Sequence, residues 1–413
     1  MFPAAQGFGR TGPTWGPGAR TVVQSLIVAV FVQGPTSAEL YKYVPNHRPP
    51  VLSVVAIAVT FVGALAVLTS LERLERWRRF AGSRTVSVIL LGGIAVVSPP
   101  LYHLWAHHLP AGTTESAVTR AMSEPVHALL HGDQMYRISL PADVPASPGP
   151  GWIILNAPFT LIHASWLLIP FWLAATAVVI RVAYGRGLEV NVGLVLLCVS
   201  PHFARMLAED QDLLVVPCAI IILIVVTHRW MRSMPTTAVI GIFAAAVATS
   251  RLLYVLFPVV LGMLAWRRSR VQAVTVTAIG LAGAVMFNVV AAIGISPYPP
   301  AHLFGRADIK EPTWNIAVGA VVTVAVVVGM VLRYRRDVRT GDTGWLCWLA
   351  GAWAVAHGFI GFGELARFRW AFRYWEGANY LFVAALPLVA GVMLWRARTA
   401  AALPGVDRPR TPV

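Results

Sequence analysis

The chain is poor in charge, and above all in acidic residues. Only 12% of its 413 residues are charged and 18 are Asp or Glu, whereas 57% are hydrophobic. Soluble domains carry about 25% charged residues, so this composition excludes an ordinary soluble protein and predicts an integral membrane protein. The net charge of +15 would suggest nucleic acid in a soluble protein. Here the arginines separate apolar runs, as they do where they orient membrane helices, and we predict no nucleic-acid partner.

Cysteine is scarce as well. Its three copies, Cys198, Cys218 and Cys347, all fall inside apolar runs. This spacing fits neither a disulfide framework nor a CxxC metal site. We therefore interpret the cysteines as small core residues and assign no metal ligands.

Long apolar runs are the main structural signal, because a helix needs about 20 apolar residues to cross a bilayer. Eleven runs approach this length: 51–71, 84–105, 152–180, 188–201, 212–228, 235–250, 252–266, 271–294, 314–332, 344–361 and 377–395. A twelfth candidate, 21–43, is interrupted by the polar segment QGPTSAE. The predicted fold is all-α: one polytopic transmembrane bundle over residues 1–413, with 11 or 12 spans.

Arginine predicts which side each loop occupies. The segments LERLERWRRFAGSR, RVAYGRG, HRWMRSM, WRRSR and RYRRDVRT occupy every second position between spans. Cytoplasmic loops collect Lys and Arg, so we place these loops and the tail 397–413 in the cytoplasm. The longest loop, 106–151, then lies outside a plasma membrane that the chain crosses many times.

The acids follow the opposite distribution. In this topology twelve of the 18 acids lie outside. The six inner acids are Glu72, Glu75, Glu189, Asp337, Asp342 and Asp407. The positive-inside rule says little about Asp and Glu. Either the outer face carries a working site, or its loops are simply longer.

The loop 106–151 has an internal pattern. Apolar residues recur at helical spacing from Thr114 to Leu130, and TTES offers an N-cap just ahead of them. We predict an amphipathic helix on the membrane surface. A turn, HGDQMYR, and a Pro/Gly-rich stretch then lead to GPGWIILNAPF. Such a loop is suited to cover a cavity at the bilayer surface.

The order TTES, HALLHGDQMYR, SPGPGWIILNAPF, SPHFARMLAEDQDLLVV and ATSRLLYVLFP, over roughly residues 84–260, resembles the C-type (GT-C) membrane glycosyltransferase superfamily. The resemblance implies transfer of one sugar from a polyprenyl-phosphate donor to a lipid, glycan or protein acceptor on the outer face, with inversion. Two features depart from the family's pattern. The loop acid is usually Asp, whereas Glu115 stands at the matching position, and the span 51–71 precedes the large loop.

This chemistry needs a carboxylate to take the acceptor's proton and cations to hold the lipid phosphate. Glu115 is the candidate base; the alternative is an acid that stabilises the start of the surface helix. Arg251, between two apolar segments at the outer boundary, is the candidate phosphate ligand, against a snorkelling residue. Arg205 is a second candidate, against an i,i+4 pair with Glu209.

The acidic segment AEDQD adds two candidates. Asp210 and Asp212 would bind acceptor hydroxyls or a divalent cation, or belong to a salt-bridged edge with Arg205. If 203–212 is helical, Glu209 and Asp212 share one face. No other cofactor is predicted, and the divalent cation stays open.

Three further candidates lie on outer loops. Tyr136 lies in the turn HGDQMYR and matches the family's G-x-x-x-Y element. Arg369 and Arg373 alternate with aromatic residues in RFRWAFRYW, a mixture that fits a saccharide or lipid-phosphate surface. An aromatic belt that anchors a helix at the interface fits it equally well.

Two other functions compete with glycosyl transfer. A transporter or flippase would account for the many spans, but such proteins tend to carry internal repeats and ionisable groups near the midplane. We find no obvious repeat, and the acids cluster at outer span ends. An O-antigen-type polymerase or ligase shares the outer-face chemistry and stays open. Beyond donor and acceptor, the expected partners are membrane lipids.

Overall fold

A computed structural model describes residues 17–35, 49–73, 79–106, 117–136, 139–140, 144–145, 148–185, 187–266, 268–292, 313–336, 382–384, 386–387 and 389. The described chain is mostly helical, which confirms the predicted fold class at this level. Its α-helices are α1 (Pro17–Gln33), α3 (Pro49–Arg73), α5 (Arg84–Ala106), α6 (Ala117–Leu130), α7 (Pro150–Leu161), α8 (Leu168–Tyr184), α9 (Gly187–Cys198), α10 (Pro201–Glu209), α11 (Val215–Trp230), α12 (Met234–Ser250), α13 (Phe257–Trp266), α14 (Arg270–Ala292) and α16 (Thr313–Arg336).

Short elements complete the described fold. Three 3-10 helices, η1 (Ser165–Leu167), η2 (Asp212–Leu214) and η3 (Leu252–Leu256), precede α8, α11 and α13. Two antiparallel strands, β1 (Ser139–Leu140) and β2 (Val144–Pro145), pair with Ser139 opposite Pro145. This two-residue ladder in the loop 106–151 is the departure from an all-α fold.

Within the described residues, five helices are long and apolar enough to cross a membrane. They are Val51–Ser70, Arg84–Ala106, Ser165–Tyr184, Asp212–Trp230 and Arg270–Ala291. The pair α9 and α10 makes a sixth if it is counted as one bent span. The predicted spans 235–250, 252–266 and 314–332 are helical but contain shorter apolar stretches. The span 344–361 and most of 377–395 lie outside the described residues.

Two predicted spans have the wrong bounds. The run 152–180 is two helices, because α7 ends at Leu161 and His163 takes a left-handed conformation, with φ of 53°, before η1 and α8. The run 188–201 contains only α9, since Pro201 begins α10 at an angle of 83°. In the candidate 21–43, the helix α1 ends at Gln33, where the interrupting segment QGPTSAE begins. An apolar run indicates which residues are shielded from water, but it does not show where a helix ends or bends.

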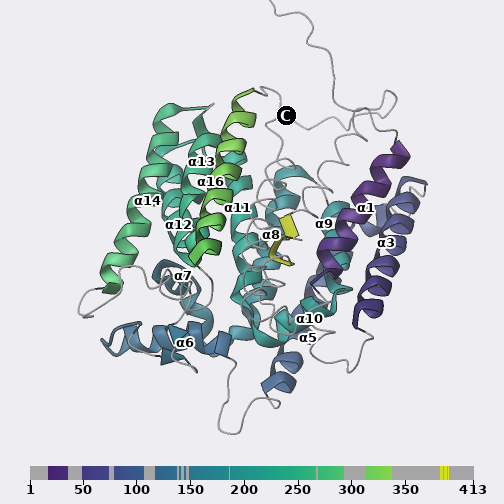
Figure 1. The fold of residues 1–413 in the computed structure, drawn as a ribbon, viewed down its shortest axis with the longest axis horizontal. Coiled ribbons are helices and arrows are strands. Elements are labelled where there is room, and N and C mark those ends of the chain that lie inside the picture. Colours follow the sequence, from purple (N-terminus) through teal and green to yellow (C-terminus); the bar gives the residue numbers. More distant parts are fainter. Residues whose placement is uncertain are drawn as a thin grey trace, which may run out of the picture.

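The predicted surface helix is present as α6, which begins at Ala117. Figure 1 shows α6 lying across one end of the upright helices, with α7 beside it, and α7 packs against α6, α12 and α14. Met122 and Val126 are buried, whereas Leu129 and Leu130 are exposed. The helical spacing therefore predicts the inward face of α6 up to its last turn.

The loops gather at two ends of the helices, as the predicted alternation requires. We call the first the α6 end: it comprises α6, the start of α7, α10, η2 and the end of α12. The second, the arginine end, comprises residues 79–84, 181–191, 227–234 and 266–270 except the two that the structure leaves undescribed, 186 and 267. There Asn191 Nδ2 donates to Ala81 O at 2.6 Å, and Arg268 donates to the carbonyl of His228.

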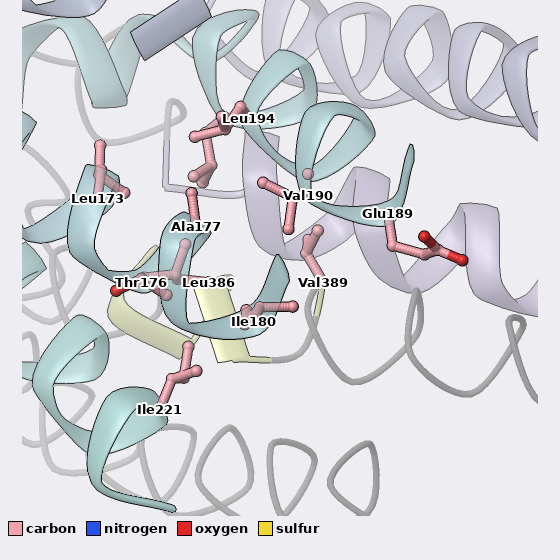
Figure 2. Close-up of a pocket in the computed structure, with 12 residues that line it drawn as sticks. Leu173, Thr176, Ala177, Ile180, Glu189, Val190, Leu194, Ile221, Leu386 and Val389 are labelled. Carbon is pink, nitrogen blue, oxygen red and sulfur yellow. The ribbon is translucent and has the colours of Figure 1, made fainter. Parts of the chain in front are cut away.

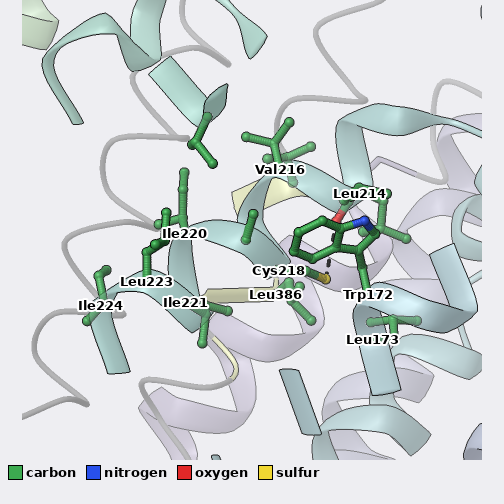
Figure 3. Close-up of a cluster of buried hydrophobic side chains, with 14 of the residues drawn as sticks. Trp172, Leu173, Leu214, Val216, Cys218, Ile220, Ile221, Leu223, Ile224 and Leu386 are labelled. Atoms are coloured by element: carbon green, nitrogen blue, oxygen red, sulfur yellow. Dashed lines mark hydrogen bonds between the residues drawn. The ribbon is translucent and has the colours of Figure 1, made fainter. Parts of the chain in front are cut away.

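Helix α11 forms the centre of the core. In its 18-residue apolar window 72% of residues are buried, against 17–22% in α3, α5 and α14. Figure 3 shows Leu214, Ile221 and Ile224 in one cluster of buried side chains with Trp172 of α8. The surrounding helices keep large apolar side chains on their outer faces.

Small residues bring α12 and α14 together. A Cβ at Gly283 of α14 would lie 2.8 Å from the Cβ of Ala245 on α12, closer than two carbons approach without contact strain. The missing side chain lets the two backbones approach, a packing that is common between membrane helices. This contact fixes the end of α12, which carries Arg251.

Candidate functional site

A buried ion pair lies at the α6 end. Arg251 Nη2 donates to Asp212 Oδ1 at 2.9 Å, and the side chains are 10% and 2% exposed. Two predicted site residues, 39 positions apart in the sequence, are therefore in direct contact. A buried charge is tolerated when it is paired and hydrogen-bonded, so each residue makes the other's burial tolerable.

Helix ends position both residues. Arg251 follows the last residue of α12 in an extended conformation, with φ of −151° and ψ of 147°, and immediately precedes η3. Its Nη1 donates to the carbonyl of Ser250 at 2.6 Å. Asp212 is the first residue of η2 and leads into α11. The pair thus connects the starts of two core helices, α11 and α13.

Trp152, which the sequence analysis does not single out, is the third member of the site. Its indole Nε1 donates to Asp212 Oδ2 at 3.0 Å, and its backbone N donates to Thr249 Oγ1 at 2.9 Å. Trp152 is completely buried. Both carboxylate oxygens of Asp212 therefore accept a hydrogen bond, one from each neighbouring element.

The sequence GPGW explains this approach. A Cβ at Gly151 would lie 2.6 Å from Cδ2 of Phe287 and 2.9 Å from Thr249 Oγ1. Only glycine allows the start of α7 to come this close to α12 and α14. Pro150 is the first residue of α7, a position where its missing N–H costs nothing. The sequence signal for this contact was the motif GPGW at the start of a helix, with Gly149 and Gly151 ahead of Trp152.

The hydrogen bonds continue from Trp152 into α8. Trp152 and Trp172 are stacked, with ring centroids 6.1 Å apart. Trp172 Nε1 donates to Asn156 Oδ1 at 2.9 Å, and Asn156 Nδ2 donates to the carbonyl of Trp152 at 2.9 Å. These neutral groups satisfy one another and connect α7 firmly to α8, so the position of Trp152 depends on both helices.

A second polar cluster precedes Asp212 in the chain. Arg205 Nε donates to Glu209 Oε1 at 2.7 Å, and Gln211 Nε2 donates to Glu209 Oε2 at 2.9 Å. The i,i+4 pair considered in the sequence analysis is present. The helical interpretation of 203–212 is wrong, because α10 ends at Glu209 and Asp210 is left-handed, with φ of 53°. Glu209 and Asp212 therefore do not share one helix face.

Of the remaining predicted site residues, the structure describes Tyr136 and Asp210. Tyr136 donates its hydroxyl to Pro148 O at 2.8 Å and so closes its own loop. Glu115, Arg369 and Arg373 lie outside the described residues. Asp210 is buried at the cap of α10.

No metal site accompanies these residues in the described part of the chain. No group of three or more His, Cys, Asp or Glu side chains there is arranged to hold a metal ion. A cavity of about 50 Å³ lies between α8, α9 and α11 and is lined almost entirely by apolar residues. In Figure 2 the carboxylate of Glu189 stands at its edge. Ligand pockets occupy roughly 300–1,000 Å³, so this cavity is too small for a sugar donor.

The geometry distinguishes the roles open to the pair. Asp212 is the more deeply buried partner and both of its oxygens are engaged. A carboxylate in this state acts as a counter-ion, since a general base needs a free oxygen within reach of the substrate's proton. Arg251 is the more exposed partner, so an incoming anion would meet its guanidinium first.

Comparison with known proteins found no match for this chain: no family model, no curated protein and no solved structure.

Proposed function

We propose that this chain is a polytopic membrane glycosyltransferase of the plasma membrane. It would transfer a sugar from a polyprenyl-phosphate donor to a lipid or glycan acceptor at the α6 end, which would face outward. The observation that carries the proposal is the buried Asp212–Arg251 pair, which lies at helix ends beside Trp152 of α7. The resemblance to the GT-C superfamily supports the reaction class.

Two features support the membrane part of the proposal. Apolar side chains cover the outer faces of α3, α5 and α14. Exposing these side chains to water would be unfavourable, whereas contact with lipid hydrocarbon is not. Four arginine-rich loops have described residues that gather at the arginine end, as the positive-inside rule requires of the cytoplasmic side. In this proposal the chain has 11 or 12 spans, including 344–361 and 377–395.

The reaction assigns a task to each charged residue. The acceptor's hydroxyl oxygen forms a bond to the anomeric carbon, while the bond from that carbon to the phosphate oxygen breaks and its electron pair stays on the polyprenyl phosphate. The hydroxyl proton passes to a carboxylate, for which Glu115 is the candidate. Arg251 would hold the departing phosphate through bidentate hydrogen bonds. Asp212 and Trp152 would keep the guanidinium in place.

The other predicted residues have supporting tasks. Arg205, held by Glu209, would add positive potential near the phosphate. Tyr136, Arg369 and Arg373 would contact the sugar or the lipid phosphate. Asp210 remains a candidate for acceptor hydroxyls. A divalent cation would need ligands from residues beyond the described part of the chain.

One observation favours a second function, a transporter. The pair α9 and α10 is bent by 83° and qualifies as a span only when both helices are counted. Discontinuous helices of this kind line the substrate sites of many transporters. The ion pair at the α6 end favours the enzyme over this alternative, because transporters bind their substrates near the midplane.

Turnover tests the proposal. Purified protein in nanodiscs would be mixed with a panel of polyprenyl-phosphate hexoses and pentoses and with a lipid extract as acceptor. We expect release of polyprenyl phosphate together with a glycosylated lipid or glycan, both measured by mass spectrometry. Movement of a lipid across proteoliposomes without any release would favour the transporter. A product that grows by repeated units would favour a polymerase.

Two variants assign the roles. Glu115→Gln keeps the shape but removes the basicity, so turnover should fall by roughly 10²–10⁴ with donor binding retained. Arg251→Lys keeps the charge but loses the bidentate geometry, so donor affinity should fall while the protein remains folded. Normal turnover of Glu115→Gln would move the base to another outer acid. Unchanged donor affinity of Arg251→Lys would leave Arg251 as a structural residue.

Orientation is tested separately. Single cysteines at Thr113 and Gly82, in an otherwise cysteine-free chain, would be labelled in intact cells with a reagent that does not cross membranes. We expect labelling at position 113 and none at position 82. The opposite pattern would place the α6 end in the cytoplasm.

A further inference from the structure

Exposed arginines gather where α11 ends, at the arginine end of the molecule. Arg268 donates its Nη1 to the carbonyl of Thr227 at 3.5 Å and its Nη2 to the carbonyl of His228. The guanidinium carbon of Arg229 lies 5.4 Å from the centroid of the Tyr184 ring. The Tyr184 hydroxyl lies 3.4 Å from His228 Nδ1. Both guanidiniums are thus anchored around His228.

Neutral groups hold these two arginines. Among the side chains that the structure describes, no carboxylate forms a salt bridge with Arg229 or Arg268. The end of a helix carries a partial negative charge of about −0.5, which explains the cap by Arg268 but does not offset two cations. The Arg229 guanidinium lies over the ring of Tyr184. In the described part of the chain no side chain accepts a hydrogen bond from Arg229, so its N–H groups are available to an anion.

The position of this cluster matches the headgroup level of a bilayer. The apolar segment Asp212–Trp230, which includes η2 and α11, is 19 residues long and ends at this cluster. Trp230 and Trp266 are 37% and 50% exposed, and the guanidinium of Arg270 lies 5.8 Å from the ring centroid of Trp266. Exposed tryptophans at the ends of apolar helices are typical of the interface between hydrocarbon and water.

We propose that Arg229 and Arg268 form a binding site for the phosphate group of an anionic glycerophospholipid. The guanidinium edges would donate to the phosphate oxygens, and the acyl chains would lie along the exposed apolar faces below Trp230 and Trp266. This inference rests on the membrane part of the proposed function and is independent of sugar transfer. A chain that transfers no sugar would still bind the lipid, and a chain that does not bind the lipid would still transfer the sugar.

Lipid retention tests the site. The full-length protein would be extracted from nanodiscs of phosphatidylcholine and phosphatidylglycerol, and the retained lipids would be counted by native mass spectrometry. The preference for phosphatidylglycerol should fall about fivefold per arginine, or about thirtyfold in Arg229→Gln/Arg268→Gln, since each arginine near the surface contributes ~1 kcal/mol. The matched control is Arg79→Gln/Arg84→Gln, which removes two exposed charges from the same end at a different place.

Each outcome of this experiment either supports the lipid site or contradicts it. Loss of preference in the first pair and retention in the control support the site. An equal loss in both pairs would replace the site by a diffuse surface charge, and a wild-type protein without preference would refute it outright. Displacement of the lipid by inorganic phosphate would assign the site to the free anion instead. If the glutamine pair does not fold, Arg229→Lys/Arg268→Lys replaces it: reduced preference supports bidentate binding, and wild-type preference contradicts it.

Discussion

Arginines at the two ends of the helices are neutralised in different ways. At the α6 end three arginines each pair with a carboxylate: Arg120 with Glu124, Arg205 with Glu209 and Arg251 with Asp212. At the arginine end, Arg181 donates to the Ser87 hydroxyl at 2.6 Å and to the Gly82 carbonyl at 3.0 Å, and Arg229 and Arg268 also contact neutral groups.

Burial accounts for part of the difference. Arg251 is only 8% exposed, and an unpaired charge at that depth would cost several kcal/mol. Arg229 and Arg268 are exposed and keep their solvation, so they need no carboxylate. Unpaired arginines remain able to bind anions from outside the protein. A paired arginine is already bonded to a carboxylate of the protein, so an incoming anion must compete with that carboxylate.

The largest effect should come from removing the counter-charge of Arg251. In Asp212→Asn the shape is kept but the guanidinium stays buried without a negative partner, so the free energy of unfolding should fall by about 3–5 kcal/mol. Unfolding in mixed micelles measures it. In Asp212→Leu/Arg251→Met both charges are absent, and much of the loss should be recovered. A loss below about 1 kcal/mol in Asp212→Asn would mean that Arg251 reaches water and that the comparison of the two ends fails.

Trp152 and Trp172 allow a matched test of the hydrogen bond to Asp212 at the α6 end. Trp152→Phe removes an N–H that donates to a carboxylate, a bond worth about 1.5–3 kcal/mol, whereas Trp172→Phe removes one that donates to an amide, worth about 0.5–1.5 kcal/mol. Both substitutions remove similar apolar volume, so the free energy of unfolding should fall more in Trp152→Phe than in Trp172→Phe. Equal losses would show that packing alone sets the cost and that Trp152 does not support Asp212.

At the arginine end the loss of a half-buried guanidinium should be smaller. Arg181→Gln breaks hydrogen bonds to neutral acceptors and leaves no buried carboxylate behind, so we expect a loss of about 1 kcal/mol. The matched variant is Arg251→Gln, which leaves Asp212 uncompensated and should cost about 3–5 kcal/mol. Similar losses in the two variants, measured in the same micelles, would remove the energetic difference between the ends.

The smallest effect should come from the pair on α6. Arg120 and Glu124 are 30% and 22% exposed and one helical turn apart. Such pairs contribute about 0.3–0.5 kcal/mol, so Glu124→Gln should lower the unfolding free energy by no more than this. Added salt should reduce the difference further, because it screens exposed charges. A loss above about 1 kcal/mol would show that carboxylates at the α6 end matter even without deep burial.

Local features were readable in advance. Helical spacing predicts α6, and i,i+4 spacing indicates the pair of Arg205 and Glu209, because such residues are neighbours on any helix. The arginine alternation predicts which loops share an end. It does not predict where a helix stops. The run 152–180 contains Pro158 and His163 near the break between α7 and α8. Proline and single polar residues also occur within membrane helices, so composition alone does not distinguish a straight span from two separate helices.

The apolar composition, the order of the apolar helices and the sorting of the arginines can be read from the sequence, because these depend on burial and on near neighbours in the chain. The partner of each charge at the site depends on how the helices pack. Asp212 lies 39 residues from Arg251 and 60 from Trp152. Helix packing selects these contacts: small residues let α12 and α14 approach, and Gly151 lets α7 reach Thr249. A buried carboxylate then takes the donors that this packing places within reach.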